Sequence, residues 1–312
     1  MRIRPGISDV LWMAAGAAVL LLFIALVLLF GKPQSPDAQL ALKAQRVDLV
    51  DRMQLGLASA SEAEKSAVLA ITDRESQAFA DQARAHTADV ERERRELVEL
   101  LNQAGTPEER DLLAEFSQRF TEFQRTDDEL LSLAVKNSNL KAYALTFGAA
   151  ADALDEMRAA LSRLVSANAD SRDAKQVMSL AFGAEVDALR IQTLLPPHIA
   201  EASDPRMDEL EALMTREDEQ VRSDLEGLRA IPKLRGDADL ALAASRYARF
   251  REIKERIVAL SRENTNVRSL SISLNQKRKV MLACHDVLSS LQEAIRKEPI
   301  EGTAYGGRFR VR

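Results

Sequence analysis

Residues 133–147 read LAVKNSNLKAYALTF, an apolar helical pattern that is interrupted by two asparagines around a serine and then resumes. Residues 260–274 read LSRENTNVRSLSISL and repeat the interruption, with a cation two residues after the second asparagine in both stretches. Asn and Ser compete for backbone groups inside a helix but satisfy free N–H groups at its start. The pattern predicts a tight helix–helix connection at residues 137–139, and a helix capped by Thr265 or Asn266.

The composition favours an all-α fold. The 312 residues include only 12 glycines and 9 prolines, and no alternating run of β-branched and aromatic residues bounded by turn residues predicts a strand. The formal net charge of -5 comes from interleaved acidic and basic residues, which argues against nucleic-acid binding. A single cysteine excludes an internal disulfide framework and a cysteine-based metal cluster.

Residues 10–31 are predicted to form a transmembrane anchor. No charged residue occurs from Val10 to Phe30, and a helix of that length spans roughly 31 Å, close to the hydrocarbon thickness of a bilayer. A cleaved signal peptide is the alternative, although its apolar region is normally shorter. Arg2 and Arg4 favour a short cytoplasmic segment at residues 1–9. We therefore expect a single-pass protein of the inner membrane with most of the chain in the periplasm.

Capping signals divide the remainder into helices. Ser35-Pro36-Asp37 has the form of a helix start, and the stretches at 61–64 (SEAE) and 106–109 (TPEE) have the form of capping boxes. These signals predict helices near residues 36–60, 62–104, 107–136 and 139–168. Later breaks, at Pro196-Pro197 and from Pro232 to Gly236, predict a second set of four helices.

Each set is expected to be an up-down-up-down four-helix bundle, because short connections make sequential helices antiparallel neighbours. The bundles would occupy residues 36–168 and 172–297, followed by a flexible basic tail at 298–312. The apolar seams of the third and fourth helices are predicted to contain Leu113, Phe116, Phe120, Phe123, Asp127, Leu130, Ala134, Leu140, Tyr143, Phe147, Ala150, Leu154, Met157, Leu161 and Leu164.

A shift of 127 positions supports a tandem duplication. It pairs residues 116–165 with 243–292 without a gap. Identical residues then occur at Arg119, Phe123, Leu133, Asn137, Asn139, Leu161, Ser162 and Leu164 and at their shifted positions. A period of this length is too long for a solenoid repeat and fits tandem domains.

Two stretches carry a resemblance to a known family. Residues 64–84 (EKSAVLAITDRESQAFADQAR) and 115–148 (EFSQRFTEFQRTDDELLSLAVKNSNLKAYALTFG) resemble the four-helix-bundle sensor domain of methyl-accepting chemotaxis proteins. The resemblance implies a periplasmic bundle that often dimerises, binds a small ligand and passes a helix displacement through the membrane. Such receptors continue with a second span and a cytoplasmic signalling module, which we do not recognise after Arg296. We therefore expect a partner receptor or kinase to supply the output in chemotaxis or related signal transduction.

Seven residues are candidate ligand contacts. Asp127 interrupts an apolar seam, and its shifted counterpart is Lys254. A cation in the first turn of a helix is unfavourable to the helix dipole, so Lys141 and Arg268 suggest a small anionic ligand beside Asn139 and Asn266. Arg52 and Arg190 occupy corresponding places in the first helices of the two sets and complete the group. The ordinary alternatives are solvated cations and, for Asp127, a polar residue that sets helix register.

No catalytic motif or cofactor-binding motif is recognised, so a non-enzyme without a cofactor is expected. His86 with Asp89 would leave zinc under-coordinated, His198 is placed in a loop, and Cys284 is expected to be a buried thiol. Two functions remain open. One is an anchored sensory module that binds a small molecule, and the other is a structural or adaptor coiled-coil protein of the cell envelope.

Overall fold

The structure is a computed structural model that describes residues 35–300. Every regular element in this range is a helix, which confirms the all-α class. None of these helices is long and apolar enough to cross a membrane. The predicted segment 1–9, the predicted anchor at 10–31 and residues 301–312 of the predicted tail lie outside the described residues.

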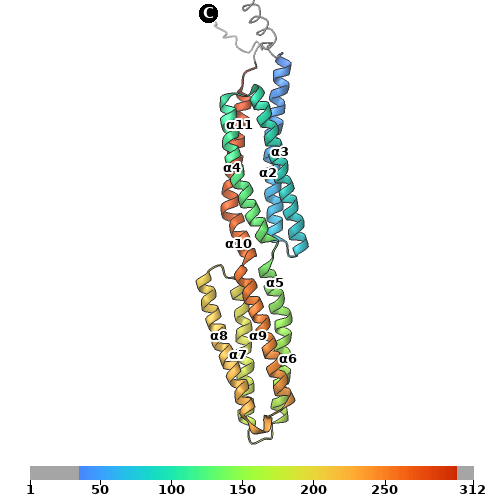
Figure 1. The fold of residues 1–312 in the computed structure, drawn as a ribbon, viewed down its shortest axis with the longest axis vertical. Helices are drawn as coiled ribbons and strands as arrows, with labels where there is room; N and C mark the ends of the chain where they lie inside the picture. The colour runs from blue at the N-terminus through green and yellow to red at the C-terminus, as the bar shows by residue number, and fades with distance from the viewer. Residues whose placement is uncertain (1–34, 301–312) are drawn as a thin grey trace, which may run out of the picture.

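Two four-helix bundles lie end to end along one long axis (Figure 1). The first bundle contains α2 (Pro36–Leu69), α3 (Asp73–Ala104), α4 (Pro107–Ala134) and α11 (Arg278–Lys297), with α10 (Thr265–Ile272) at its lower end. Phe116, Phe120 and Phe123 of α4 are at most 1% exposed, and they pack with the buried face of α11. Aromatic side chains of this size contribute a large share of the burial that holds a helical bundle together.

The second bundle contains α6 (Ala151–Ala167), α7 (Ala174–Ala200), α8 (Asp204–Ala230) and α9 (Ala238–Glu263). The short helix α5 (Ser138–Leu145) enters it from the first bundle, and a 3-10 turn (η2, Pro232–Leu234) joins α8 to α9. Its core is largely aliphatic. Tyr247 and Phe250 of α9 stack there with their ring centroids 6.0 Å apart.

The division of helices between the bundles differs from the expected one at residues 36–168 and 172–297. The helix that follows α4 packs against α9 and α7, whereas the last helix of the chain packs against α4 and α2. Figure 1 shows the reason: α5 continues in the direction of α4 instead of turning back, and α10 does the same after α9. The two predicted sets have thus exchanged their fourth helices.

The internal repeat is visible in the backbone. Asn137 and Asn264 both adopt the left-handed conformation, with φ of 50° and 53°. Each is followed by an eight-residue α-helix and then by a five-residue π-helical segment, η1 (Thr146–Ala150) or η3 (Ser273–Lys277). Asn tolerates this conformation better than most residues, because its short side chain can hydrogen-bond locally.

Several helix ends follow the sequence signals. The Ser35 side chain caps α2, and Thr106 with Glu109 forms the predicted capping box of α4. Gly105 is the C-cap of α3. These signals act within a single turn of helix, so tertiary packing does not overrule them.

Other boundaries are wrong. The expected break at residues 61–64 is absent, because Ala60, Ala63 and Ala67 continue the buried face of α2; α3 begins instead after Thr72. The prolines at 196 and 197 do not end α7, which runs to Ala200 because His198 and Ile199 are buried in the core of the second bundle. Burial of an apolar face offsets the one or two helical hydrogen bonds that proline removes.

The predicted seam of α4 is confirmed, since all its positions from Leu113 to Ala134 are buried. The seam of the following helix is confirmed from Ala150 onward. The predicted burial of Phe147 is wrong, because this side chain is 68% exposed. It lies in the π-helical segment η1, which shifts the helical phase relative to a regular α-helix.

The two ends of the described chain lie together at one end of the molecule (Figure 1). Lys43 near the start of α2 donates hydrogen bonds of 2.7 Å to the carbonyls of Arg296 and Glu298. Arg46 pairs at 2.7 Å with the capping-box acid Glu109 and also with Glu298. Three segments distant in sequence are therefore tied together at this end.

Candidate functional site

The two repeated stretches are joined by reciprocal hydrogen bonds where the bundles meet. We call this group, Ser138, Asn139, Thr265 and Asn266, the clasp. The side-chain Oδ1 of Asn139 accepts from the backbone N–H of Asn266 at 3.1 Å, and the side-chain Oδ1 of Asn266 accepts from the backbone N–H of Asn139 at 3.2 Å. Ser138 and Thr265 exchange hydrogen bonds in the same way, each backbone N–H donating to the other hydroxyl at 3.0 Å. The free N–H groups at the start of each helix are thus satisfied by the other repeat.

The Asn139 amide has further partners in the second bundle. It donates to the Ile199 carbonyl at 2.7 Å and to the Asn264 side chain at 2.8 Å. Asn266 donates to the Asn137 side chain at 3.0 Å, and Asn137 donates to Asp73 and Ser76 of α3. The two predicted asparagines are therefore brought together, and their polar groups are occupied within the protein.

Lys141 and Arg268 do not converge on a binding site in the structure. Lys141 pairs with Asp73 at 2.9 Å and donates to the carbonyl of Lys136 at 2.8 Å. Arg268 is exposed. A shallow hollow of about 330 Å³ lies beside the clasp, and it is lined by apolar side chains together with Asn139 and Asn266.

The two arginines on the first helices are exposed. Arg52 on α2 pairs with Asp48, one turn earlier. Arg190 on α7 pairs with Asp187 at 2.7 Å and lies 3.5 Å from Glu217. Neither arginine lines the hollow beside the clasp or the groove between α3 and α4.

Asp127 has the clearest special environment of the predicted residues. It is 2% exposed and forms an ion pair with Lys277 of η3, whose ammonium lies 3.4 Å from the centre of the Phe123 ring. The sequence singled out Asp127 but not Lys277, because the partner comes from a helix that the exchange brings into the first bundle. The sequence offers one sign of this ion pair: Lys277 interrupts an apolar helix face, as Asp127 does in its own helix.

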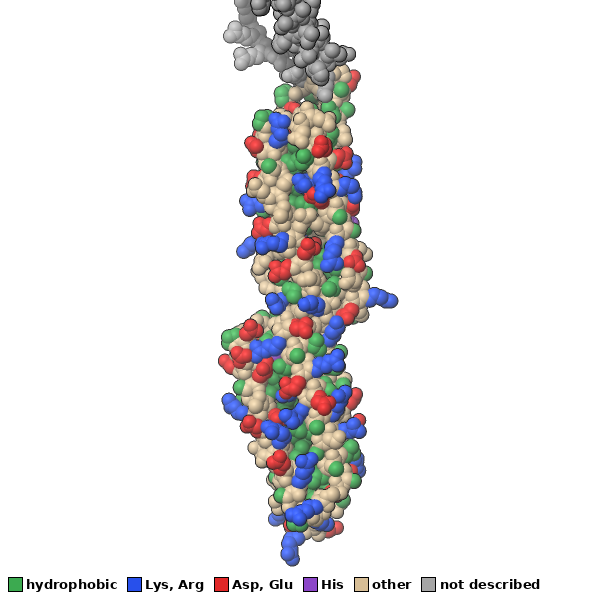
Figure 2. All heavy atoms as spheres, viewed as in Figure 1, with side chains coloured by type: hydrophobic (Ala, Val, Ile, Leu, Met, Phe, Trp, Pro, Cys, Tyr) green, Lys and Arg blue, Asp and Glu red, His purple; other side chains and the backbone are tan. Residues whose placement is uncertain are grey.

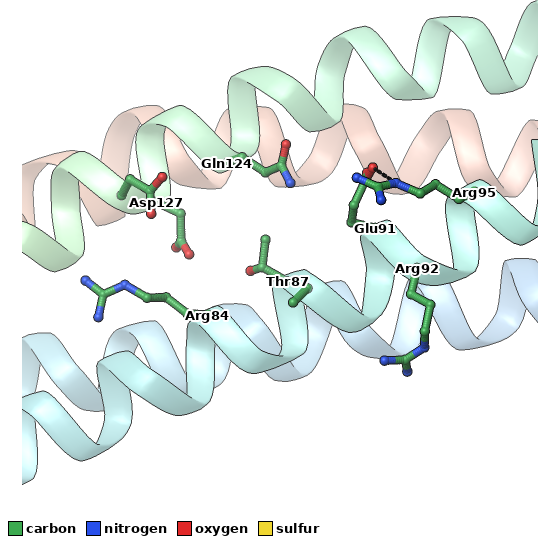
Figure 3. Close-up of a pocket in the computed structure, with 9 residues that line it drawn as sticks. Arg84, Thr87, Glu91, Arg92, Arg95, Gln124 and Asp127 are labelled. Carbon is green, nitrogen blue, oxygen red and sulfur yellow. Dashed lines mark hydrogen bonds and ion pairs between the residues drawn. The ribbon is translucent and has the colours of Figure 1, made fainter.

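Asp127 also lines a groove between α3 and α4. These helices touch each other more sparsely than α2 and α3 do, which leaves an open groove of about 740 Å³. Figure 3 shows Arg84, Thr87 and Arg95 of α3 on the side facing α4, opposite Gln124 and Asp127. The sequence did not predict this groove, because its two walls lie on separate helices.

One end of the groove carries excess positive charge. Glu91 accepts from Arg94 at 2.8 and 2.9 Å and from Arg95 at 2.7 Å, so a single carboxylate is shared by two guanidinium groups. Hydrogen bonds from Arg94 lower the pKa of Glu91 to about 2. Arg94 also donates to Ser117 of α4 at 3.1 Å and thereby links α3 to α4.

The corresponding gap in the second bundle is bridged. Asp218 of α8 accepts a hydrogen bond of 2.7 Å from Tyr247 of α9 and pairs with Arg251 of α9 at 2.8 Å. The 127-residue shift pairs Tyr247 with Phe120 and Arg251 with Gln124, neither of which can supply these charged contacts in the first bundle. The open groove is a feature of the first bundle.

The described residues offer little for metal binding or nucleophilic chemistry. Within residues 35–300, no group of three or more His, Cys, Asp or Glu side chains could hold a metal ion. His198 lies in α7 instead of the predicted loop, and it contacts Ser261 and Glu211 at 2.8 Å, but His198 and Ser261 are fully buried. Cys284 is buried as expected, and burial raises the pKa of its thiol to about 12.

Charged side chains are mixed in sign over the surface of both bundles on the face shown in Figure 2. Figure 2 shows Lys, Arg, Asp and Glu interleaved along both bundles on the face in view, without an extended surface of one sign. The face in view therefore carries no basic stripe of the kind that nucleic-acid-binding proteins use.

Comparison with known proteins relates part of the chain to one family. No curated protein is similar enough in sequence to count as a relative. A family model described as the four helix bundle sensory module for signal transduction matches residues 55–179. The matched range runs from within α2 to the first turns of α7, so its consecutive helices are divided here between two bundles. Residues 55–179 are thus similar to the four-helix bundle sensory module of chemotaxis proteins, as the sequence resemblance predicted.

Proposed function

We propose that this protein is a sensory module that binds a small anionic ligand in the α3–α4 groove of its first bundle. The groove carries the proposal, because it is open, accessible and has two guanidinium groups sharing one carboxylate at one end. Arg84, which also pairs with Asp81 at 3.2 Å, and Arg95 supply positive charge, while Thr87 and Gln124 supply neutral hydrogen-bonding groups. Arginine suits carboxylate and phosphate because its planar fork donates two parallel hydrogen bonds.

The groove replaces the clasp as the preferred anion site. Asn139 and Asn266 are committed to the clasp, and Lys141 is paired with Asp73, so the ligand role first proposed for these residues and for Arg268 now has less support. Arg52 and Arg190 remain available on the surface as partner contacts. Asp127 keeps a ligand role as part of the groove wall.

Binding is tested with the full chain. Isothermal calorimetry and thermal unfolding are measured with inorganic phosphate and with mono-, di- and tricarboxylates, using neutral analogues for comparison. We expect at least one anion to raise the melting temperature, and Arg84→Gln with Arg95→Gln to weaken its binding at least tenfold. Arg158→Gln is the matched control, because Arg158 lies on α6 and pairs with Asp155 at 2.8 Å. If no anion binds, or if the groove variants bind as the control does, the proposal is wrong.

We further propose that the module is anchored by residues 10–31 in the inner membrane, faces the periplasm and signals as a homodimer or through a partner receptor or kinase. The common position of both described ends supports output at that end of the molecule. Cysteine labelling in intact cells tests orientation: Glu99→Cys places a thiol on the exposed surface of α3, whereas the native Cys284 is buried. Labelling only after the inner membrane is opened would contradict the periplasmic location.

An adaptor role is the second candidate, favoured by exposed apolar side chains near the clasp. Leu69 and Ile71 are 71% and 78% exposed, and Leu270 is 41% exposed beside the same hollow. Apolar groups gathered at one place on a surface often mark a contact with another protein. A partner that co-purifies with the wild type and is lost from Leu69→Ser and Ile71→Ser would favour this role over ligand sensing.

A further inference from the structure

Glu64 is a buried acid without a hydrogen-bond partner in the core of the first bundle. It is 0% exposed, and neither carboxyl oxygen accepts a hydrogen bond. The Ser273 hydroxyl faces it from η3, outside hydrogen-bonding geometry. Leaving an ionised carboxylate in such a place costs several kcal/mol, so the neutral acid is the form that the site accommodates.

The surroundings leave Glu64 without a countercharge of its own. The nearby ammonium of Lys277 is already paired with Asp127, and these two side chains are 1% and 3% exposed. With all three groups ionised, two carboxylates would share one ammonium inside the bundle. A proton on Glu64 removes that excess negative charge.

We propose that Glu64 is a proton-binding site and that proton occupancy is a second input to this sensory module. Loss of the proton creates a carboxylate that competes with Asp127 for Lys277. Asp127 lines the groove, so this competition loosens the link between α4 and η3 at the wall of the groove. The inference rests on the proposed sensory role, but it does not require the anion site.

The site is specific to the first bundle. Under the 127-residue shift, Asp127 corresponds to Lys254, which pairs with Glu255 at 2.8 Å, and Lys277 corresponds to Ala150. The second bundle folds around the equivalent positions without any such cluster. The buried charges are therefore an addition to the fold rather than a requirement of it.

The sign of the pH dependence follows from the burial. Burial raises the pKa of Glu64, whereas the Ser273 hydroxyl and the Lys277 ammonium act against this rise. The folded protein then holds a proton that the unfolded chain has lost, so stability falls as pH rises above the ordinary glutamate pKa of about 4.3. The ionisable groups that face the cluster are Lys65 on α2, Arg84 on α3, Asp127 and Asp128 on α4, Lys277 on η3 and Cys284 on α11.

The test compares the full-length wild type with Glu64→Gln and with Glu62→Gln, a control at an exposed position of the same helix. Urea unfolding is followed by circular dichroism from pH 4.5 to 8.5. We expect the unfolding equilibrium constant of the wild type to rise with pH relative to Glu64→Gln, by up to tenfold for each unit of raised pKa. Glu62→Gln should follow the wild type.

Infrared spectroscopy observes the proton directly. One component of the protonated carboxyl band should persist in the wild type above the ordinary glutamate pKa of about 4.3, titrate away as pH rises further and be missing from Glu64→Gln. The wild-type band decides the matter if Glu64→Gln does not fold. Equal pH slopes in wild type and Glu64→Gln, or a wild-type spectrum without a protonated carboxyl component above the ordinary glutamate pKa, would overturn the proposal. Arg95→Gln should retain the pH response, so failure of the anion site and failure of the proton site are distinguishable.

Discussion

Removing the clasp is expected to destabilise the protein far more than its small number of atoms suggests. In Asn139→Ala, the side chain loses its donors to Ile199 and Asn264 and its acceptor for the Asn266 N–H. Each lost hydrogen bond costs about 0.5–1.5 kcal/mol net, and buried partners left unpaired raise the cost, so we expect a loss of about 2–4 kcal/mol.

The assay is a double-mutant cycle of Asn139→Ala and Asn266→Ala in the full chain, measured by urea unfolding. Because the two side chains cap each other's helices, their effects should be non-additive, with an interaction energy of about 0.5–3 kcal/mol. Asn102→Ala, at an exposed position near the end of α3, is the control and should change stability by less than about 0.5 kcal/mol. Hydrogen exchange should also accelerate at the amides of residues 138, 139, 265 and 266.

Two results would refute this reasoning. The first is a loss below about 0.5 kcal/mol for Asn139→Ala, since that is the range of ordinary surface substitutions. The second is strict additivity in the cycle, which would mean that the two helix starts are satisfied independently, for instance by water. Either result would show that the bundles are joined only by their continuous helices.

Three further predictions concern the first bundle. Asp127→Ala removes the ion-pair partner of the buried Lys277 and should cost about 3–5 kcal/mol in urea unfolding at a pH where Glu64 keeps its proton, whereas Asp127→Leu combined with Lys277→Met should recover much of the loss. Thr106→Ala removes the capping-box hydroxyl of α4 and should lower the free energy of unfolding by about 0.5–2 kcal/mol, with the exposed Thr121→Ala as its control. The depressed pKa of Glu91, about 2, gives stability that is present above the unfolded value and is lost as pH falls toward 2; acid unfolding of Glu91→Gln should lack this component, and an unchanged acid limb would contradict the ion-pair geometry.

The sequence predicted features whose cause lies within one or two turns of helix. The caps at Ser35 and Thr106 and the seam from Leu113 to Ala134 depend on local hydrogen bonding and on helical period, which one segment of sequence contains in full. The failed break at residues 61–64 shows the limit of such signals. Ser61 and Glu64 have the spacing of a capping box, yet the buried face that α2 presents from Arg46 to Val68 outweighs a cap of about 1 kcal/mol.

The groove and the proton site could not be predicted in the same way. Arg84 and Asp127 become neighbours only when α3 and α4 are placed side by side. Glu64 and Lys277 meet only because the last helix of the chain returns to the first bundle. Partners so far apart in sequence leave no local pattern, so the sequence showed an anomaly at Asp127 without the residue that explains it.

The exchange of fourth helices depends on the two asparagine stretches acting together. A left-handed residue at 137 or 264 interrupts a helix and leaves the next helix with unsatisfied N–H groups. Neither repeat satisfies these N–H groups from its own residues. The side chains of Ser138 and Asn139 accept hydrogen bonds from the backbone N–H groups of Thr265 and Asn266, and the side chains of Thr265 and Asn266 accept from the N–H groups of Ser138 and Asn139. If either chain segment turned back into its own bundle, both sets of acceptors would lose their donors. Straight continuation of α4 into α5 and of α9 into α10 is therefore stabilised as a pair, which explains why a motif that resembles a tight turn instead carries each helix across the junction.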